Sequence, residues 1–310
     1  MRVSVVINPR AGAGAAARQL PKLRQGLNEL GLAYEILETQ RPGHATALAV
    51  RAIEEGCTLL AVAGGDGTLN EVSQAYIEPD GTPRAGPPLA LLPCGTGGDF
   101  PRSCDFRQGG FSGGLARIAA GRQRPLDLGV ITLHDIRGHA IHRAFLNIAS
   151  VGISGAVDER VERGPKWLGG KAAFLIGTVG AALGYRNVPV AIEIDGVAWH
   201  EGPMLITAIA NGRFLGGGMQ IAPGANFSDG LLDVVCVGDV SRARFLALFP
   251  RVYRGAHLDL DVVRTLRGRS VSVRPLLRDK PVLVDVDGET PGCLPVSARI
   301  FPSALQLCSD

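Results

Sequence analysis

The first third of the chain alternates short apolar runs with segments of helical spacing. The predicted strands are 3–8, 33–39, 57–63 and 88–93, and the predicted helices are 15–30, 44–56 and 68–77. This β-α-β-α order favours a parallel sheet with helices on both faces. Ligands of such sheets bind beyond the carboxyl ends of the strands.

The pattern changes near residue 125, after which short strand-like runs between Gly and Pro turns dominate. The predicted strands are 125–133, 144–150, 190–195, 204–211, 231–237, 270–275 and 282–286. Helical patterns return at about 155–185 and at 241–255. The sequence therefore predicts an α/β domain over 1–125, followed by an antiparallel β-rich domain with helical insertions over 126–294.

Composition and charge narrow the function classes. The 310 residues are 46% hydrophobic and 20% charged, which is typical of a soluble globular protein, and a net charge of +3 gives no argument for nucleic-acid binding. None of the six cysteines has C-x-x-C spacing, so a zinc site is not expected and the thiols should stay reduced. The N-terminus has no signal-peptide pattern, and the apolar run 172–184 is too short to span a bilayer.

Three glycine-rich segments follow predicted strands, at 8–14, 64–68 and 93–100. The first fits the dinucleotide fingerprint G-x-G-x-x-A loosely, with Glu35 further on. The four residues Asn8-Pro9-Arg10-Ala11 stand between the apolar residues of the strand and its first glycine, Gly12, which argues against a nicotinamide oxidoreductase. The chain has no G-x-x-x-x-G-K-[ST] motif and is therefore not a P-loop NTPase.

The second segment, Gly64-Gly65-Asp66-Gly67-Thr68, ends a buried strand and begins a helix. Glycine amides before a helix N-terminus form an anion site, and the missing side chains leave room for a phosphate. Asp66 fits there only beside a cation or within a hydrogen-bonded network. A tight turn with Asp66 as N-cap explains the same residues, and the stretch alone does not choose between the two.

Further segments, in order, decide the interpretation: INPRAG, GGDGTLNEV, PCGTGGDFPR, FLNIASVG, NGRFLGGGMQIAPGANFSDGLLDVV and VDVDGE. With this set the whole chain resembles the lipid kinases that include bacterial diacylglycerol kinases, sphingosine kinases and ceramide kinases. GGDGT alone is shared with NAD kinases and, in related form, phosphofructokinases. The resemblance implies an ATP-binding first domain, a β-sandwich-like lipid-substrate domain, an active site between them, and a return of about 295–310 to the first domain.

The resemblance also implies the nucleotide contacts, with Asp66 counted among the catalytic residues as well. They are Asn8, Pro9, Arg10, Ala11, Gly12, Thr39, Gly64, Gly65, Asp66, Gly67, Thr68, Leu69, Asn70, Glu71, Thr96 and Asp99. The chain departs from the family pattern in two places. Gly98 replaces the usual asparagine of G-T-x-N-D-F, and the first loop lacks its usual basic residue, for which Arg10 or Arg18 could compensate.

Two strands end in Asp-Gly, at Asp195 and at Asp287, and on pattern alone both are hairpin tips. The resemblance selects Asp287 as the general base and Glu289 as its catalytic neighbour. A carboxylate beside an alcohol can accept the proton as the phosphoryl group transfers. Asp195 serves as the comparison.

The segment 225–231 clusters oxygen ligands of the kind that a hard cation takes. The resemblance places Asp229 in a structural magnesium site, with backbone oxygens near Asn226 and Leu231. A plain hairpin turn explains the same residues, and both interpretations stay open.

We therefore expect an ATP- and Mg²⁺-dependent lipid kinase acting on a hydroxyl of a diacylglycerol-like lipid. The alternatives are a soluble NAD kinase and a non-catalytic nucleotide-binding regulator. We expect a cytoplasmic protein that is peripheral at the inner face of the membrane and meets its lipid substrate at the membrane surface. We expect no nucleic-acid partner, and a homodimer is one possible oligomeric state. The run 172–184, around Leu175, is expected either to line an acyl-chain pocket that opens near the membrane or to be a core helix.

Overall fold

The computed structural model describes residues 2–94, 98–106, 109–155, 157, 177, 180, 184–277 and 281–310. The chain forms two compact units, Met1–Leu128 with Phe301–Asp310, and Gly129–Ile300, and each is described by itself. The first unit extends to Leu128, where the sequence predicted a boundary at 125/126. Its returning segment begins at Phe301, where the sequence predicted about 295.

A parallel sheet forms the centre of the first unit. Its strands are β1 (Arg2–Ile7), β2 (Ala33–Glu38), β3 (Leu59–Gly64), β4 (Leu89–Pro93) and the end of β15 (Glu289–Cys308). Their order is β15-β4-β3-β1-β2, and every neighbouring pair is parallel. The parallel α/β architecture predicted from the hydrophobic pattern is therefore confirmed.

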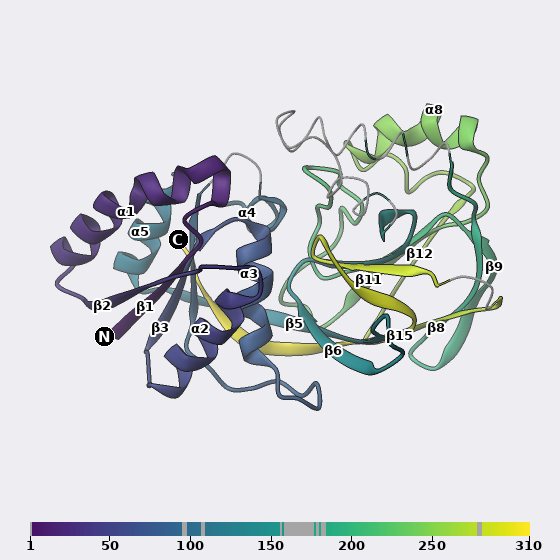
Figure 1. Ribbon diagram of the computed structural model, residues 1–310. Coiled ribbons are helices and arrows are strands. Elements are labelled where there is room, and N and C mark those ends of the chain that lie inside the picture. The colour runs from purple at the N-terminus through teal and green to yellow at the C-terminus, as the bar shows by residue number, and fades with distance from the viewer. Residues whose placement is uncertain are drawn as a thin grey trace. The chain divides into compact units, whose positions relative to one another are not determined.

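Helices cover both faces of this sheet, with α1 and α5 packed together on one side and α2 and α3 on the other (Figure 1). The helices of this unit are α1 (Ala11–Glu29), α2 (His44–Glu54), α3 (Asp66–Ser73), the 3₁₀ turn η1 (Gln74–Tyr76), α4 (Asp99–Ser103) and α5 (Gly110–Ala120). All six residues of β3 are buried, as expected of a central strand covered on both faces.

Helix α5 was not predicted, because its sequence GFSGGLARIAA is rich in glycine, which weakens helical patterns. The packing explains one of these glycines. A Cβ atom at Gly114 would lie 2.4 Å from the Leu91 carbonyl oxygen, so the missing side chain lets α5 approach β4 closely. Tertiary contact here overrides local propensity.

The second unit is built from antiparallel strands, which confirms the predicted β-rich domain. Its elements are β5 (Gln123–His134), β6 (Ala140–Phe145), β7 (Ile148–Gly152), β8 (Val188–Ile194), β9 (Val197–Met204), β10 (Ile206–Ala210), β11 (Leu232–Val237), α8 (Arg242–Val252), β12 (Val263–Gly268), β13 (Ser270–Pro275) and β14 (Leu283–Val286). Strands β12, β11, β10, β7, β14 and β15 neighbour one another in that order. A cluster of buried Val, Ile and Leu side chains forms the core of the unit.

Two strand predictions were wrong in one respect. The predicted strand 144–150 is broken at Leu146 and Asn147, so that β6 and β7 are separate, and the predicted strand 204–211 is broken at Leu205. Apolar runs do not reveal such junctions, because the residues within them are also buried. The helical pattern at 241–255 is confirmed as α8, which Ser241 caps by accepting a hydrogen bond from Arg244 N.

The predicted insertion at about 155–185 lies almost wholly outside the described residues. Leu175 and most of the apolar run 172–184 therefore carry no structural account.

Candidate active site

The carboxyl ends of β1, β2, β3 and β4 meet along one edge of the first unit's sheet. In three backbone hydrogen bonds, the residue after one strand donates to a residue at the end of the neighbouring strand: Asn8 N to Ala63 O at 3.1 Å, Thr39 N to Ile7 O at 2.9 Å, and Cys94 N to Gly64 O at 3.0 Å. Most predicted nucleotide contacts therefore come from neighbouring loops of one unit. Thr96, which belongs to the same set, lies outside the described residues.

Packing within the fold requires a glycine at position 64 but not at position 65. A Cβ atom at Gly64 would lie 2.5 Å from Thr68 Oγ1, so packing within the turn excludes a side chain. Gly65 has a φ of −104°, which any residue adopts, and a Cβ there would have no described atom within 4 Å. The described fold explains Gly64 but not Gly65, whose open space suits an approaching ligand.

Asp66 is held in place by one carboxylate oxygen and not by the other. Its Oδ2 accepts a hydrogen bond from Asp99 N at 2.6 Å, whereas its buried Oδ1 has no partner among the described residues. Burial raises the pKa of the Asp66 carboxyl, although the N–H groups of Asp99 and Phe100 and the Arg102 guanidinium oppose the shift. An unsatisfied buried carboxylate oxygen is costly, and a cation would offset that cost.

Glycine at position 98 has a packing explanation. A Cβ atom at Gly98 would lie 2.8 Å from Pro101 Cδ and 3.0 Å from Asp66 Oδ1. Asp99 remains buried and pairs with Arg102, whose Nη1 lies 2.5 Å from Asp99 Oδ1. The nearby Pro101 and Asp66 atoms thus explain why position 98 is glycine. The backbone N–H of Asp99 holds Asp66 Oδ2.

The first loop turns sharply after β1. Asn8 shapes it, because Asn8 Oδ1 accepts from Arg10 N at 3.1 Å and Asn8 O accepts from Ala11 N at 3.0 Å. Gly12 has a φ of +58°, and a Cβ there would lie 2.6 Å from Cys94 O, so glycine is needed both for conformation and for contact with the segment after β4. Pro9 is half-buried within the loop.

Of the two candidate basic residues, Arg18 points back to this loop. Its Nη1 donates to Ala13 O at 3.3 Å. The Arg10 residue is exposed. Among the described residues, the Arg10 side chain makes no hydrogen bond or ion pair, so Arg10 is the one left open to contact a ligand.

The residues after the glycine turn serve the fold in the described structure. Thr68 and Leu69 are buried, and Glu71 Oε2 accepts from Ala45 N at 2.9 Å, which satisfies a free N–H at the start of α2. Asn70 is buried, and its Nδ2 lacks a hydrogen-bond acceptor among the described residues. In the structure, Leu69 packs in the core and Glu71 caps α2. Their predicted contacts with the nucleotide stay predictions.

In the second unit, the Asp287 carboxylate binds the backbone of the β6–β7 junction. Its Oδ2 accepts from Leu146 N at 2.8 Å, and its Oδ1 accepts from Asn147 N at 3.1 Å and Ile148 N at 2.8 Å. A carboxylate offers about four acceptor positions, so most of this group's capacity serves the fold. Glu289, its predicted neighbour, is exposed at the start of β15.

The acid within β14, Asp285, was not among the predicted site residues. Asp285 is 1% exposed, and its Oδ1 accepts from Gly288 N at 2.7 Å within the turn that carries Asp287. Its Oδ2 lies 2.9 Å from Ser150 Oγ, which lies 2.8 Å from Ser154 Oγ. The signal was an acid inside the apolar run VLVDV, since an ionisable residue in a buried strand is rarely there for packing alone.

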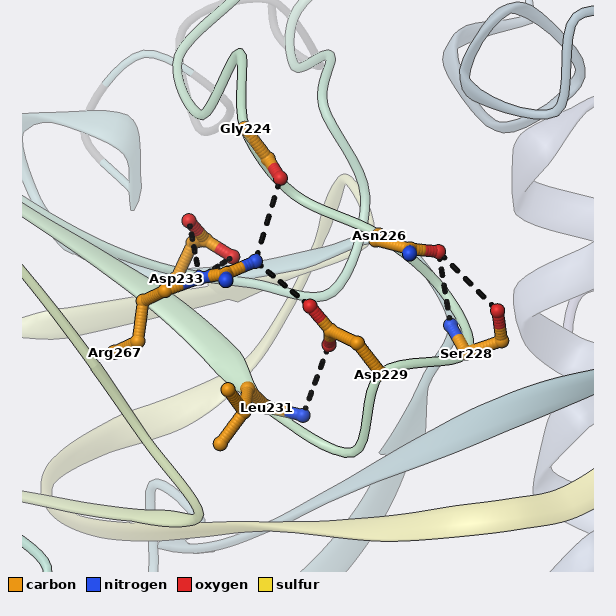
Figure 2. Close-up of polar contacts among 7 residues, drawn as sticks. All are labelled: Gly224, Asn226, Ser228, Asp229, Leu231, Asp233 and Arg267. Carbon is orange, nitrogen blue, oxygen red and sulfur yellow. Dashed lines mark hydrogen bonds and ion pairs between the residues drawn. The ribbon is translucent and has the colours of Figure 1, made fainter.

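Asp229, the acid of the predicted magnesium site, is paired with Arg267 in the structure (Figure 2). Arg267 Nη2 lies 2.7 Å from Asp229 Oδ2 and 3.4 Å from Gly224 O, and Arg267 Nε lies 3.2 Å from Asp233 Oδ2. The positions of Asp233 and Arg267 follow from the register, since they face each other on β11 and β12. The guanidinium thus occupies the place where a cation would neutralise the acids.

Leu231 and Asn226 also make hydrogen bonds within the turn, through atoms other than the backbone oxygens that the magnesium prediction assigned to them. Leu231 donates its N–H to Asp229 Oδ1 at 3.1 Å, and Asn226 Oδ1 accepts from Ser228 N and Ser228 Oγ, both at 3.2 Å. Over the described ranges, no group of three or more His, Cys, Asp and Glu residues is arranged to hold a metal ion. Asp229 is therefore paired with Arg267 in this turn, and a magnesium site that uses backbone oxygens near Asn226 and Leu231 stays a prediction.

Neither unit contains, over its described residues, a helix long and apolar enough to cross a membrane.

Two family models match consecutive parts of the chain. The model described as "Diacylglycerol kinase catalytic domain" matches residues 2–131. The model described as "YegS C-terminal NAD kinase beta sandwich-like domain" matches residues 147–309.

Curated relatives match over most of their length. A diacylglycerol kinase of Mycobacterium tuberculosis strain H37Rv is 29% identical over 99% of this chain and 94% of its own. A probable lipid kinase YegS-like protein of Xanthomonas euvesicatoria is 31% identical over 85% of this chain and 82% of its own.

Solved structures show the same fold. A diacylglycerol kinase from Bacillus anthracis has a TM-score of 0.75 at 23% identity and is matched over 100% of this chain and 97% of its own. An NAD kinase from Archaeoglobus fulgidus, solved in complex with ATP, has a TM-score of 0.52 at 14% identity over 100% and 94%.

Proposed function

Since the chain belongs to the family of diacylglycerol kinases and YegS-like lipid kinases, we propose that it transfers the γ-phosphoryl group of ATP to a hydroxyl of a diacylglycerol-like lipid. The main observation in support of ATP binding is the glycine turn that follows β3. Gly65 leaves open space that no described side chain needs, and the buried Asp66 Oδ1 beside it lacks a hydrogen-bond partner among the described residues.

The phosphates would lie against the backbone of Gly64–Thr68 and the first loop, where α3 begins. Backbone N–H groups and the helix dipole favour an anion there. Mg²⁺, when bound with the nucleotide, would neutralise phosphate charge. Asp66 Oδ1 is the atom that fits such an ion, and Asp99 N holds the other oxygen in place.

The acceptor hydroxyl must lose its proton as the phosphoryl group arrives. Asp287 and Glu289 are the proposed proton acceptor and its neighbour. Asp287 is already oriented by three backbone N–H groups, and Glu289 is exposed at the beginning of β15. In this proposal Asp287 both orders the β6–β7 junction and takes the proton.

An NAD kinase is the second candidate, since the fold also resembles that of the Archaeoglobus fulgidus enzyme. The match to the diacylglycerol kinase catalytic model and the curated relatives above favour a lipid substrate. A nucleotide-binding regulator would bind ATP without turnover.

The test combines the protein, Mg²⁺ and ATP labelled at the γ-phosphate with diacylglycerols, ceramide, sphingosine or NAD. Label in the organic phase with a diacylglycerol supports the proposal, and label on NAD supports the second candidate. ATP binding without transfer to any acceptor supports the regulator.

Variants at one glycine test the nucleotide side. Gly65→Ala and Gly65→Val should both fold, because position 65 is extended and open among the described residues. ATP binding should fall progressively from wild type through alanine to valine, because the side chain enters the phosphate space. Thermal melting and ATP binding are measured on the same samples. A folded Gly65→Val protein with wild-type ATP affinity would place the phosphates elsewhere.

A further inference from the structure

A second, buried carboxylate holds the turn that carries Asp287. Asp285 is 1% exposed within β14, and its Oδ1 accepts from Gly288 N at 2.7 Å. Its Oδ2 lies 2.9 Å from the hydroxyl of Ser150, the residue that faces Asp285 on the neighbouring strand β7. Since an ionised carboxylate can only accept hydrogen bonds, the Ser150 hydroxyl donates to it. Both oxygens of Asp285 are thus fixed, one by a neighbouring strand and one by the turn.

The same kind of turn forms elsewhere in this unit without a buried acid. Asp195 and Gly196 have positive φ values, as Asp287 and Gly288 do. Among the described residues, no side chain accepts a hydrogen bond from Gly196 N, whereas Asp285 accepts one from Gly288 N. Burying a carboxylate is costly, and strands rarely contain one for packing alone. The need to form the turn therefore does not explain Asp285.

The bond to Gly288 N helps to determine where the Asp287 carboxylate lies. The register between β14 and β15 is irregular between Val284 and Val286, which is the position of Asp285, so backbone pairing is interrupted just before the turn. Asp287 has a φ of 51°, a left-handed conformation that persists in a non-glycine residue when surrounding contacts hold it. Asp285 supplies such a contact on the C-terminal side of Asp287.

We propose that Asp285 is a positioning residue for phosphoryl transfer, which holds the Asp287 carboxylate in place through Gly288 N and is itself oriented by Ser150. This inference rests on the proposed function, because it needs Asp287 to act as the proton acceptor. Asp285 should therefore affect the chemical step and not the binding of ATP, whose proposed contacts come from the first unit. A misplacement of about 1 Å in a reacting group can cost about 10²-fold in rate.

Two variants of Asp285 separate its hydrogen bonds from the space that it fills. Asp285→Asn keeps an oxygen for Gly288 N and places an NH₂ group beside Ser150 Oγ, so the turn should stay in place. Asp285→Leu keeps a similar branched shape but has no acceptor, so the turn loses this contact. We expect kcat to fall roughly 10- to 100-fold in Asp285→Leu and only slightly in Asp285→Asn, with ATP affinity unchanged in both.

Asp127, in the first unit, provides a matched control. It is 0% exposed, and its Oδ1 accepts from Ser303 N at 2.7 Å, which is the same kind of bond as that of Asp285 to Gly288 N. Asp127→Leu should therefore lose stability in urea unfolding, as Asp285→Leu does, and yet keep the wild-type kcat. Rates are measured at a temperature at which each protein is folded. An equal loss of kcat in both leucine variants would show a general effect of losing a buried acid and would overturn the inference.

A second measurement does not depend on activity. Hydrogen exchange followed by mass spectrometry, without nucleotide or lipid, reports on the N–H groups of residues 146–148, which bind the Asp287 carboxylate. Exchange there should be faster in Asp285→Leu than in wild type, Asp285→Asn or Asp127→Leu. If Asp285→Leu does not fold, Ser150→Ala removes the donor to Oδ2 and should show the same changes on a smaller scale.

A folded Asp285→Leu protein with the wild-type kcat would overturn the inference, and so would equal losses of kcat in Asp285→Asn and Asp285→Leu. Ser150→Ala, used in place of an unfolded Asp285→Leu, would overturn it by keeping both the wild-type rate and the wild-type exchange. Failure of the kinase proposal is separate. Faster exchange at 146–148 in Asp285→Leu, with no phosphoryl transfer by wild type to any acceptor, would reject the kinase and keep Asp285 as the residue that holds the turn.

Discussion

The two Asp-Gly turns of the second unit have nearly the same backbone and the same use of the carboxylate. Asp195 and Asp287 both have a φ of 51°, and the glycines that follow have φ values of 78° and 89°. Asp195 accepts from the N–H groups of the β12–β13 junction, at 2.9 and 2.8 Å, and Asp287 accepts from those of the β6–β7 junction. Each carboxylate therefore stabilises a junction between two consecutive strands by accepting hydrogen bonds from its backbone N–H groups.

The turns differ in what lies behind them. Two residues before Asp287 stands the buried Asp285, which binds Gly288 N and Ser150. Two residues before Asp195 stands Glu193, which is only half-buried. A shared turn shape thus shows how an aspartate is held, whereas the buried polar network behind one turn is what suggests chemistry there.

The largest expected effect is at Asp287. An asparagine has one acceptor oxygen and an NH₂ group, so Asp287→Asn cannot accept from all three junction N–H groups. We expect a loss of roughly 1–3 kcal/mol in the free energy of unfolding. We also expect turnover to fall about 10²–10⁴-fold with little change in ATP affinity. Urea unfolding, ATP binding and phosphoryl transfer are measured together.

The structure changes how this variant is interpreted. Because Asp287 also orders the backbone, lost activity alone does not identify a proton acceptor. The rate must be taken from protein shown to be folded at the assay temperature. A folded Asp287→Asn enzyme with wild-type turnover would reject the proton-acceptor role.

The next largest effect is expected at Gly196 and Gly288, the glycines that follow Asp195 and Asp287. Gly196→Ala and Gly288→Ala both force a side chain into a left-handed conformation, and neither Cβ would meet a described atom within 4 Å. Each should therefore lose roughly 1–2 kcal/mol of stability, by nearly equal amounts. Only Gly288→Ala should also slow phosphoryl transfer. Thermal unfolding and initial rates decide this, and a rate loss in Gly196→Ala of the same size would remove the functional distinction.

The alternation of strands β1 to β4 with helices α1 to α3 could be predicted, because β3 and β4 are uninterrupted apolar runs and helical spacing separates the strands. The junction at Leu146 and Asn147 could not, since what breaks the strand is Asp287, 140 residues away from Asn147 in the chain. Long-range hydrogen bonds of this kind leave no periodic signal in the local sequence.

The candidate site shows the same limit. The spacing of Gly64, Gly65 and Asp66 predicted a ligand-binding turn, but only the structure separates Gly64, which packing requires, from Gly65, which it does not. The oxygen-rich turn around Asp229 predicted a cation, and the positive charge comes from Arg267 on another strand. The acidic residues in the sequence indicate that a positive charge is required, but only the fold shows that Arg267 lies next to Asp229.

A smaller effect is expected at Asp195. Asp195→Asn removes a carboxylate that binds Arg269 N and Ser270 N, but the turn is exposed, so water can replace part of the lost bonding. We expect a loss of about 1 kcal/mol in unfolding free energy and no change in turnover. Urea unfolding and initial rates measured beside Asp287→Asn provide the comparison. A rate loss matching that of Asp287→Asn would mean that both acids act only through the fold.

The smallest effect concerns Arg267, on the strand that leads into the junction held by Asp195. Arg267→Met keeps an unbranched apolar stem but removes the guanidinium, and it leaves Asp229 and Asp233 without their cation. Since the arginine side chain is 46% exposed, the loss should be only about 0.2–1 kcal/mol. Wild-type melting should be the same in EDTA and in millimolar Mg²⁺, because the guanidinium already supplies the charge. In Arg267→Met, added Mg²⁺ should restore part of the lost stability, because two carboxylates and the Gly224 carbonyl then lack a positive partner. Wild-type protein that melts earlier in EDTA, with no further loss in Arg267→Met, would show that a metal ion and not Arg267 holds this turn.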